Sequence, residues 1–194
     1  MASIFESIKA GDVDAVRAAI NDDPSVAAAR DDKGLSAVRA AVYAHKQDVA
    51  DVLLEAKPEL DIFDAAAVGD VDRLNELLDK DPDLVKAYSE DGYTPLHFAA
   101  YFSRGPAVRA LLDRGADVNA VAKNDMEVQP LHSAVAADAR EVVAALLMAG
   151  ADVNARQQGG ITPFMAASER DEEGDMVRLL MDHGAEESAA PPTE

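Results

Sequence analysis

The sequence lacks cysteine altogether, has few basic residues and contains no long hydrophobic run. Without cysteine, the chain can form neither disulfide bonds nor thiolate metal sites. Its 18 Lys and Arg residues are outnumbered by 37 Asp and Glu residues, which gives a formal net charge of −19. Nucleic acids and anionic membranes are bound through clustered cations, so this charge argues against both as partners. A basic protein partner would be attracted by the same charge, which also serves solubility by itself.

The hydrophobic runs are too short to cross a bilayer, and residues 1–6 (MASIFE) have neither the basic nor the apolar region of a signal peptide. We therefore expect a cytoplasmic protein. Ser3 and Glu6 have the spacing of a capping box, which predicts that a helix begins beside them. Residues 187–194 include Pro191 and Pro192 and little apolar material, which predicts a disordered tail.

Motifs for catalysis and for metal binding are also missing. The sequence contains no phosphate-binding loop, no dinucleotide-binding glycine pattern and no Gly-x-Ser-x-Gly motif. None of the four histidines has a second histidine four residues further on, the spacing of a helical zinc site. The acidic residues 171–175 resemble the middle of a calcium loop, but Leu180 occupies the twelfth position, where a bidentate carboxylate is needed. We expect no enzymatic activity, no cofactor and no metal, and we interpret 171–175 as a solvated turn.

What the sequence does contain is a motif that returns. Residues 94–100 (TPLHFAA) are followed by residues 115–120 (GADVNA), and close copies of both come one repeat later. Thr94 can cap a helix whose first position is Pro95, and Gly115 can end the next helix in a left-handed conformation. Repeats near 33 residues indicate a solenoid of stacked helix pairs. The copies are residues 129–134 with 150–155, and residues 162–167 with 184–186.

These motifs resemble the ankyrin repeat family, and the resemblance covers nearly the whole chain, most strongly residues 91–186. It implies an all-α solenoid of about six helix-turn-helix repeats, which forms a single domain over residues 1–186. Short hairpin loops, which we call fingers, join the repeats. The alanine-rich, compact repeats resemble those of small, stand-alone bacterial ankyrin proteins. The predicted repeats are residues 1–30, 31–61, 62–89, 90–122, 123–156 and 157–186.

One connection is shorter than the others. If Ile4, Val38, Ile62 and Leu96 are equivalent core positions, the steps between them are 34, 24 and 34 residues. The short step predicts that a finger is missing near residues 58–62, which would leave a notch in the row of fingertips. The connections of a solenoid usually form its binding face, although a neutral deletion would look the same.

The family resemblance also implies a structural role for His97 and His132. At this place in the motif, the ring hydrogen-bonds the loop backbone and ties adjacent repeats together. The other repeats have no histidine there, so the resemblance implies that they lack the tie. The residues at those positions are Phe5, Arg39, Phe63 and Met165.

In this family the contact face is formed by the fingertips and the exposed side of the first helices. Carried over to this sequence, those positions include aromatic residues, which are typical interface anchors but could equally fill space beside alanines. The candidate partner-binding residues are Tyr43, Tyr93, Tyr101, Phe102, Glu90 and Asp91. The equivalent positions in the last two repeats are less aromatic and comprise Ala136, Ala137, Glu169 and Arg170, with Gln157, Gln158 and Ile161 at a fingertip.

We therefore predict a monomeric, non-enzymatic protein-protein interaction module, a scaffold, adaptor or regulator that binds through the concave face of its inner helices and fingers. One alternative is a small-molecule-binding, peptide-binding or peptide-modifying activity in the notch between the second and third repeats. This would need a polar pocket near Asp61 and Asp64. Another alternative is a self-associating structural protein.

Overall fold

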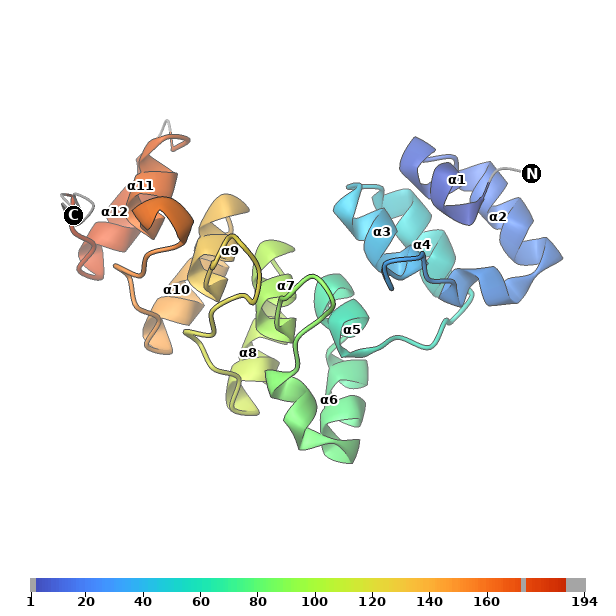
Figure 1. Ribbon diagram of the computed structural model, residues 1–194, viewed down its shortest axis with the longest axis horizontal. Coiled ribbons are helices and arrows are strands. Elements are labelled where there is room, and N and C mark those ends of the chain that lie inside the picture. Colours follow the sequence, from blue (N-terminus) through green and yellow to red (C-terminus); the bar gives the residue numbers. More distant parts are fainter. Residues whose placement is uncertain (1–2, 172–173, 188–194) are drawn as a thin grey trace.

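The computed structural model describes residues 3–171 and 174–187, and its regular secondary structure within these residues is helical (Figure 1). Twelve α-helices follow one another as antiparallel pairs along an arc, with three short 3₁₀ helices between them. The α-helices are α1 (Ile4–Ala10), α2 (Val13–Asp22), α3 (Ala37–Tyr43), α4 (Gln47–Glu55), α5 (Ile62–Val68), α6 (Val71–Lys80), α7 (Pro95–Tyr101), α8 (Gly105–Asp113), α9 (Pro130–Ala136), α10 (Arg140–Met148), α11 (Pro163–Ser168) and α12 (Asp175–Asp182). The 3₁₀ helices are η1 (Pro24–Ala28), η2 (Pro82–Lys86) and η3 (Gln158–Gly160). The predicted all-α solenoid is confirmed.

The helices form two rows. The odd-numbered helices α1 to α11 pack on one another in order and form the inner row, while the even-numbered helices form the outer row. Within a pair, the two helices also pack together, so a single apolar core runs along the stack. Each repeat buries its apolar face only against its neighbours, which is the general arrangement of a solenoid.

Local sequence signals set the helix ends as predicted. The Ser3 hydroxyl accepts a hydrogen bond from the Glu6 backbone N–H (3.3 Å), and the Glu6 carboxylate accepts one from the Ser3 N–H (2.9 Å), which completes a capping box. Thr94 is the N-cap of α7 and Pro95 its first residue. Gly115 follows α8 with a φ of 84°, in the left-handed region that glycine adopts without strain.

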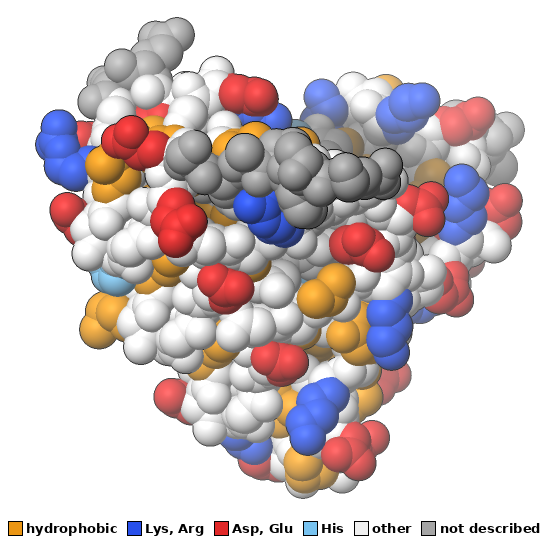
Figure 2. Space-filling model, turned by 60° about the vertical axis from the view of Figure 1, so that its left-hand side comes forward, with side chains coloured by type: hydrophobic (Ala, Val, Ile, Leu, Met, Phe, Trp, Pro, Cys, Tyr) orange, Lys and Arg blue, Asp and Glu red, His pale blue; other side chains and the backbone are white. Residues whose placement is uncertain are grey.

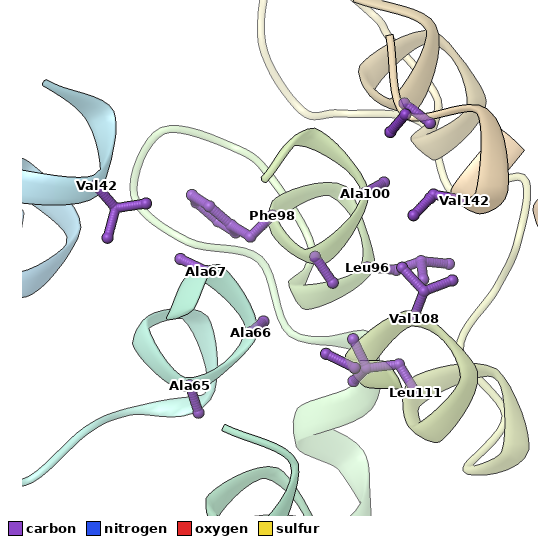
Figure 3. Close-up of a cluster of buried hydrophobic side chains, with 14 of the residues drawn as sticks. Val42, Ala65, Ala66, Ala67, Leu96, Phe98, Ala100, Val108, Leu111 and Val142 are labelled. Carbon is purple, nitrogen blue, oxygen red and sulfur yellow. The ribbon is translucent and has the colours of Figure 1, made fainter. Parts of the chain in front are cut away.

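Small side chains on α5 let aromatic side chains from the helices on either side of it meet. Ala65, Ala66 and Ala67 are completely buried. Figure 3 shows the Phe98 ring extending from α7 past Ala67 toward Val42 on α3. Phe98 itself is only 2% exposed, so it fills the space that the alanines leave.

The shortened connection lies where the spacing predicted it. Helix α4 ends at Glu55 and α5 begins at Ile62, with no finger between them and only an extended trace (Figure 1). As a result, α4 and α6 have almost no contact, although α2 packs on α4 and α6 packs on α8. A groove of about 490 Å³ therefore opens between the outer helices. Its lining includes Leu54, Leu60, Val68 and Arg73.

The notch expected among the fingertips is bridged by side chains. The Glu90 carboxylate lies directly against Gly34, so the fingers of the second and fourth repeats meet across the missing one. The Tyr43 hydroxyl also donates a hydrogen bond to the Asp91 carboxylate at 3.2 Å. The missing finger explains both the contact between the neighbouring fingers and the groove between α4 and α6. Without it, the fingers on either side come together while the outer helices move apart.

Arg39 corrects the prediction that repeats without the motif histidine lack a tie. Its Nε lies 2.8 Å from Oδ1 of Asp64 on α5, and both side chains are almost completely buried. The Ser36 hydroxyl donates a hydrogen bond to the same carboxylate at 2.6 Å. The Arg39 guanidinium also lies 5.5 Å from the centre of the Phe98 ring. An ion pair therefore replaces the histidine at the shortened connection.

Near the carboxyl end, the acidic turn has a capping role. The Asp171 carboxylate accepts hydrogen bonds from the backbone N–H groups of Gly174 (3.1 Å) and Val177 (2.8 Å), at the start of α12. The rest of that turn, residues 172–173, and nearly all of the predicted tail, residues 188–194, lie outside the described residues. Among the described helices, none is long and apolar enough to cross a membrane.

Candidate functional site

A groove of about 420 Å³ lies on the inner row, where α7, α9 and α11 meet the fingers that precede α7, α9 and α11. The exposed large hydrophobic side chains gather there: of the six among the described residues, Tyr101, Met126 and Ile161 line it. Such gathering exceeds the scattered single exposures of an ordinary surface and is typical of binding sites. The full lining is Tyr43, Tyr93, His97, Phe98, Tyr101, Met126, Val128, His132, Ser133, Ala136, Gln157, Ile161, Ala166, Glu169 and Arg170.

Two of the predicted aromatic residues form one side of the groove. Tyr101 ends α7 and is 39% exposed. Tyr93, in the preceding finger, is half-buried, and its hydroxyl lies 3.5 Å from the sulfur of Met126 in the next finger. Its ring centre is 5.7 Å from that of His97. The rings are thus held in place by neighbours while one edge stays accessible.

The other two predicted aromatic residues, Tyr43 and Phe102, pack mainly on each other and on Tyr101. Tyr43 reaches the groove from α3, but its ring packs edge-on against Phe102 at 5.3 Å. Phe102 does not line the groove and packs on Tyr101 at 5.1 Å. Burial, together with the negative charge of Asp91, raises the pKa of Tyr43 far above its usual range. Its hydroxyl therefore stays protonated and keeps donating to Asp91.

The two motif histidines form the floor. His97 Nδ1 lies 2.7 Å from the Thr94 hydroxyl, and its Nε2 donates to the carbonyl of Val128 at 3.0 Å, which ties the fourth repeat to the fifth. Burial lowers the pKa of His97 to about 4 and also lowers that of His132. Both rings are therefore neutral near pH 7. His132 Nδ1 accepts a hydrogen bond from the Gln129 backbone N–H within its own repeat (3.2 Å), but its buried Nε2 makes no hydrogen bond in the described part of the chain, so the tie to the next repeat is seen for His97 and not for His132.

The groove also includes residues that the sequence did not single out. Phe98, Met126 and Val128 were missed, and the last two repeats, expected to look less like an aromatic pocket, supply part of the same groove. Met126 could have been noticed from the spacing of the repeats. The step from Leu96 to Leu131 is 35 residues, longer than the usual repeat, and Met126 lies in the finger within that step.

The two aspartates of the alternative site, Asp61 and Asp64, are already held by neighbouring side chains. Asp64 is held by Arg39 and Ser36, and Asp61 lies 2.8 Å from Arg30. Neither aspartate lines the groove between α4 and α6. Arg73 lines that groove, but it already donates a hydrogen bond to the Leu60 carbonyl. No group of three or more His, Asp or Glu side chains in the described part of the chain is placed to hold a metal ion.

The chain as a whole is strongly acidic, with a formal net charge of −19. Figure 2 shows acidic and basic side chains spread over the visible face, with hydrophobic side chains between them. At the groove itself, Glu169 and Arg170 sit together at the end of α11. The arrangement offers aromatic surface, open polar groups and charge, which are means of binding a macromolecule.

Comparison with known families and proteins identifies the repeated unit. Residues 62–157 match the family model described as ankyrin repeats, in three copies. The human DNA-binding protein RFXANK is 33% identical over 106 residues, which are 54% of this chain and 41% of that protein. The probable E3 ubiquitin-protein ligase XBOS31 of Oryza sativa subsp. japonica is 41% identical over 66 residues, 34% of this chain and 15% of that protein. Palmitoyltransferase akr1 of Schizosaccharomyces pombe is 40% identical over 60 residues, 31% of this chain and 9% of that protein.

This chain thus spans less than half the length of these relatives. Their names describe different activities, so what the matched segments have in common is the repeat and not a reaction. The expected bacterial character is not borne out, because these relatives come from human, rice and fission yeast.

Proposed function

Because this chain belongs to the ankyrin repeat family, we propose that it is a non-enzymatic adaptor or regulator that binds a partner protein through the groove on α7, α9 and α11. Ankyrin repeats are general protein-protein interaction modules. In this proposal residues 1–186 act as one domain and one monomer, in the cytoplasm, and the partner is a protein and not a nucleic acid or a membrane.

The observation that carries the proposal is the position of Tyr101, Met126 and Ile161. Three exposed apolar side chains from three different repeats line a single groove. Exposed apolar surface of this kind gains free energy when a partner covers it, and aromatic anchors contribute most. Tyr93 and Tyr101 are the proposed anchors. Tyr43 and Phe102 hold them in position, and Glu90 and Asp91 form the acidic rim.

The test is a quantitative affinity capture that compares wild type with two single variants. Tyr101→Ala removes an anchor in the groove, whereas Met148→Ala removes an apolar side chain that is 83% exposed on α10, outside it. We expect at least one partner protein to be lost about tenfold or more with Tyr101→Ala, as for an interface hot spot, and retained with Met148→Ala. Equal capture by all three proteins, with the fold intact by circular dichroism, would place the contact elsewhere.

A further inference from the structure

Polar groups without partners lie within the groove as well as apolar ones. Among the described residues, the Ser133 hydroxyl, the Gln157 side-chain amide and the Tyr101 hydroxyl line the groove and make no hydrogen bond. Together they offer both donors and acceptors. An extended peptide presents N–H and C=O groups along its length, and each must find a partner when water is removed. The backbone of a bound peptide could pair with these side chains, whereas a purely apolar partner surface would leave them without hydrogen bonds.

The charges around the groove favour a positively charged occupant. The carboxylates of Glu90, Glu127 and Glu169 take part in no ion pair among the described residues. The nearby cations, by contrast, are already engaged. Lys123 lies 3.9 Å from the centre of the Tyr88 ring, Arg156 donates to the Gly160 carbonyl, and Arg170 donates to the Ala136 carbonyl. The surrounding field is also negative, since the chain carries a formal charge of −19.

An acidic occupant would find little to bind. His97 and His132 are neutral near pH 7 because burial lowers both pKa values, so neither ring supplies a cation to the groove. Arg170 is the single Lys or Arg in the lining, and Glu169 precedes it directly. The lining therefore has no excess positive charge.

We propose that the groove binds an extended peptide segment of the partner that carries a Lys or Arg side chain next to a Leu, Ile or Met side chain. The apolar side chain lies over Ala136, between Tyr101 and Ile161, where the small alanine leaves room. The basic side chain pairs with Glu169, and the peptide backbone bonds to Ser133 and Gln157. This specificity rests on the proposed function, which it refines from a protein partner to a basic and apolar sequence.

The test begins with a displayed library of peptides with ten random positions, selected on wild type at 150 mM NaCl. Selected sequences should be enriched in adjacent basic and apolar residues. Selection of neutral or acidic peptides that lose binding to Tyr101→Ala would overturn this specificity and leave the proposed function standing. If no peptide of any class is selected, the proposal of an extended peptide fails, while the affinity capture with Tyr101→Ala still decides the proposed function.

A charge comparison then locates the basic side chain. For a synthetic peptide from the selection, Glu169→Gln should weaken binding about threefold, as expected for a partly exposed ion pair, in a fluorescence polarisation titration. Glu141→Gln, the same change at an exposed position on the outer helix α10, should have no effect. Replacing the peptide's basic residue with norleucine should abolish the difference between wild type and Glu169→Gln. Persistence of that difference would show that Glu169 acts in another way.

Discussion

At the scale of single residues, His97 connects stability to pH. Burial lowers its pKa from 6.5 to about 4, because the charged ring loses its hydration inside the protein, and this outweighs the opposite effect of the hydrogen bond to the Val128 carbonyl. The unfolded chain therefore binds a proton more readily than the folded one. The stability that the neutral His97 ring contributes is therefore complete above pH 6.5 and is lost as the pH falls toward 4.

We expect this histidine to make the free energy of unfolding fall by about 1 kcal/mol between pH 7.0 and pH 5.5. The measurement is urea unfolding of wild type, His97→Gln and His183→Gln at both pH values. His97→Gln should be less stable throughout but should lose less on acidification. His183 is exposed, so His183→Gln should keep the wild-type difference. An equal loss in all three proteins would mean that other groups, the carboxylates and the buried His132, account for the acid sensitivity.

The residues also show where sequence reasoning succeeds and where it stops. The caps at Ser3, Thr94 and Gly115 could be predicted because each depends on neighbours within a few residues. The pairing of Arg39 with Asp64 could not, because it depends on how α3 of one repeat packs on α5 of the next. In that setting an arginine can do what the motif histidine does elsewhere.

At the scale of helices, α5 connects the first four helices to the rest of the inner row. It lies between α3 and α7, and its completely buried alanines allow Phe98 to reach past it. Its place in the repeat could be predicted from the spacing of Val38 and Ile62. The groove could be predicted only in part, since Tyr101 belongs to the family's contact positions whereas Met126 and Ile161 join it through the stacking of later repeats.

Enlarging an α5 alanine should separate its neighbours. We expect Ala66→Leu to lower the free energy of unfolding by about 1–3 kcal/mol, because the extra methylene groups have no room in a packed interior. Ala10→Leu is the control, since Ala10 is exposed at the end of α1, and it should change stability by less than about 0.5 kcal/mol. Urea unfolding followed by circular dichroism measures both. A neutral Ala66→Leu would show that the stack can adjust its spacing at α5.

At the scale of the whole molecule, the outer row of the stack is weakest between α4 and α6 within the described residues. The inner row is continuous, but the outer row is interrupted between α4 and α6, where a groove replaces helix packing. Helices α1 to α4 are therefore joined to the rest mainly through α3, by the Arg39–Asp64 pair and the aromatic contacts of Tyr43. The stability of a solenoid is close to a sum over repeats and their interfaces, so a weak interface divides it into units that open separately.

We expect amides in α1 to α4 to exchange with solvent faster than those in α7 to α10, measured by hydrogen–deuterium exchange with mass spectrometry. Arg39→Leu should widen the difference, because it removes the buried cation beside Asp64 and leaves that carboxylate only Ser36 and the more exposed Arg30, at a cost of about 3 kcal/mol, roughly a hundredfold in the opening equilibrium. Arg17→Leu is the matched control: it removes an exposed ion pair with Glu55 in the same unit and should change exchange only slightly. Equal protection of both units in wild type, or faster exchange throughout the chain in Arg39→Leu, would show that the six repeats open as one. Faster exchange confined to α1 to α4 would place the boundary at the shortened connection, where the sequence already lacks a finger.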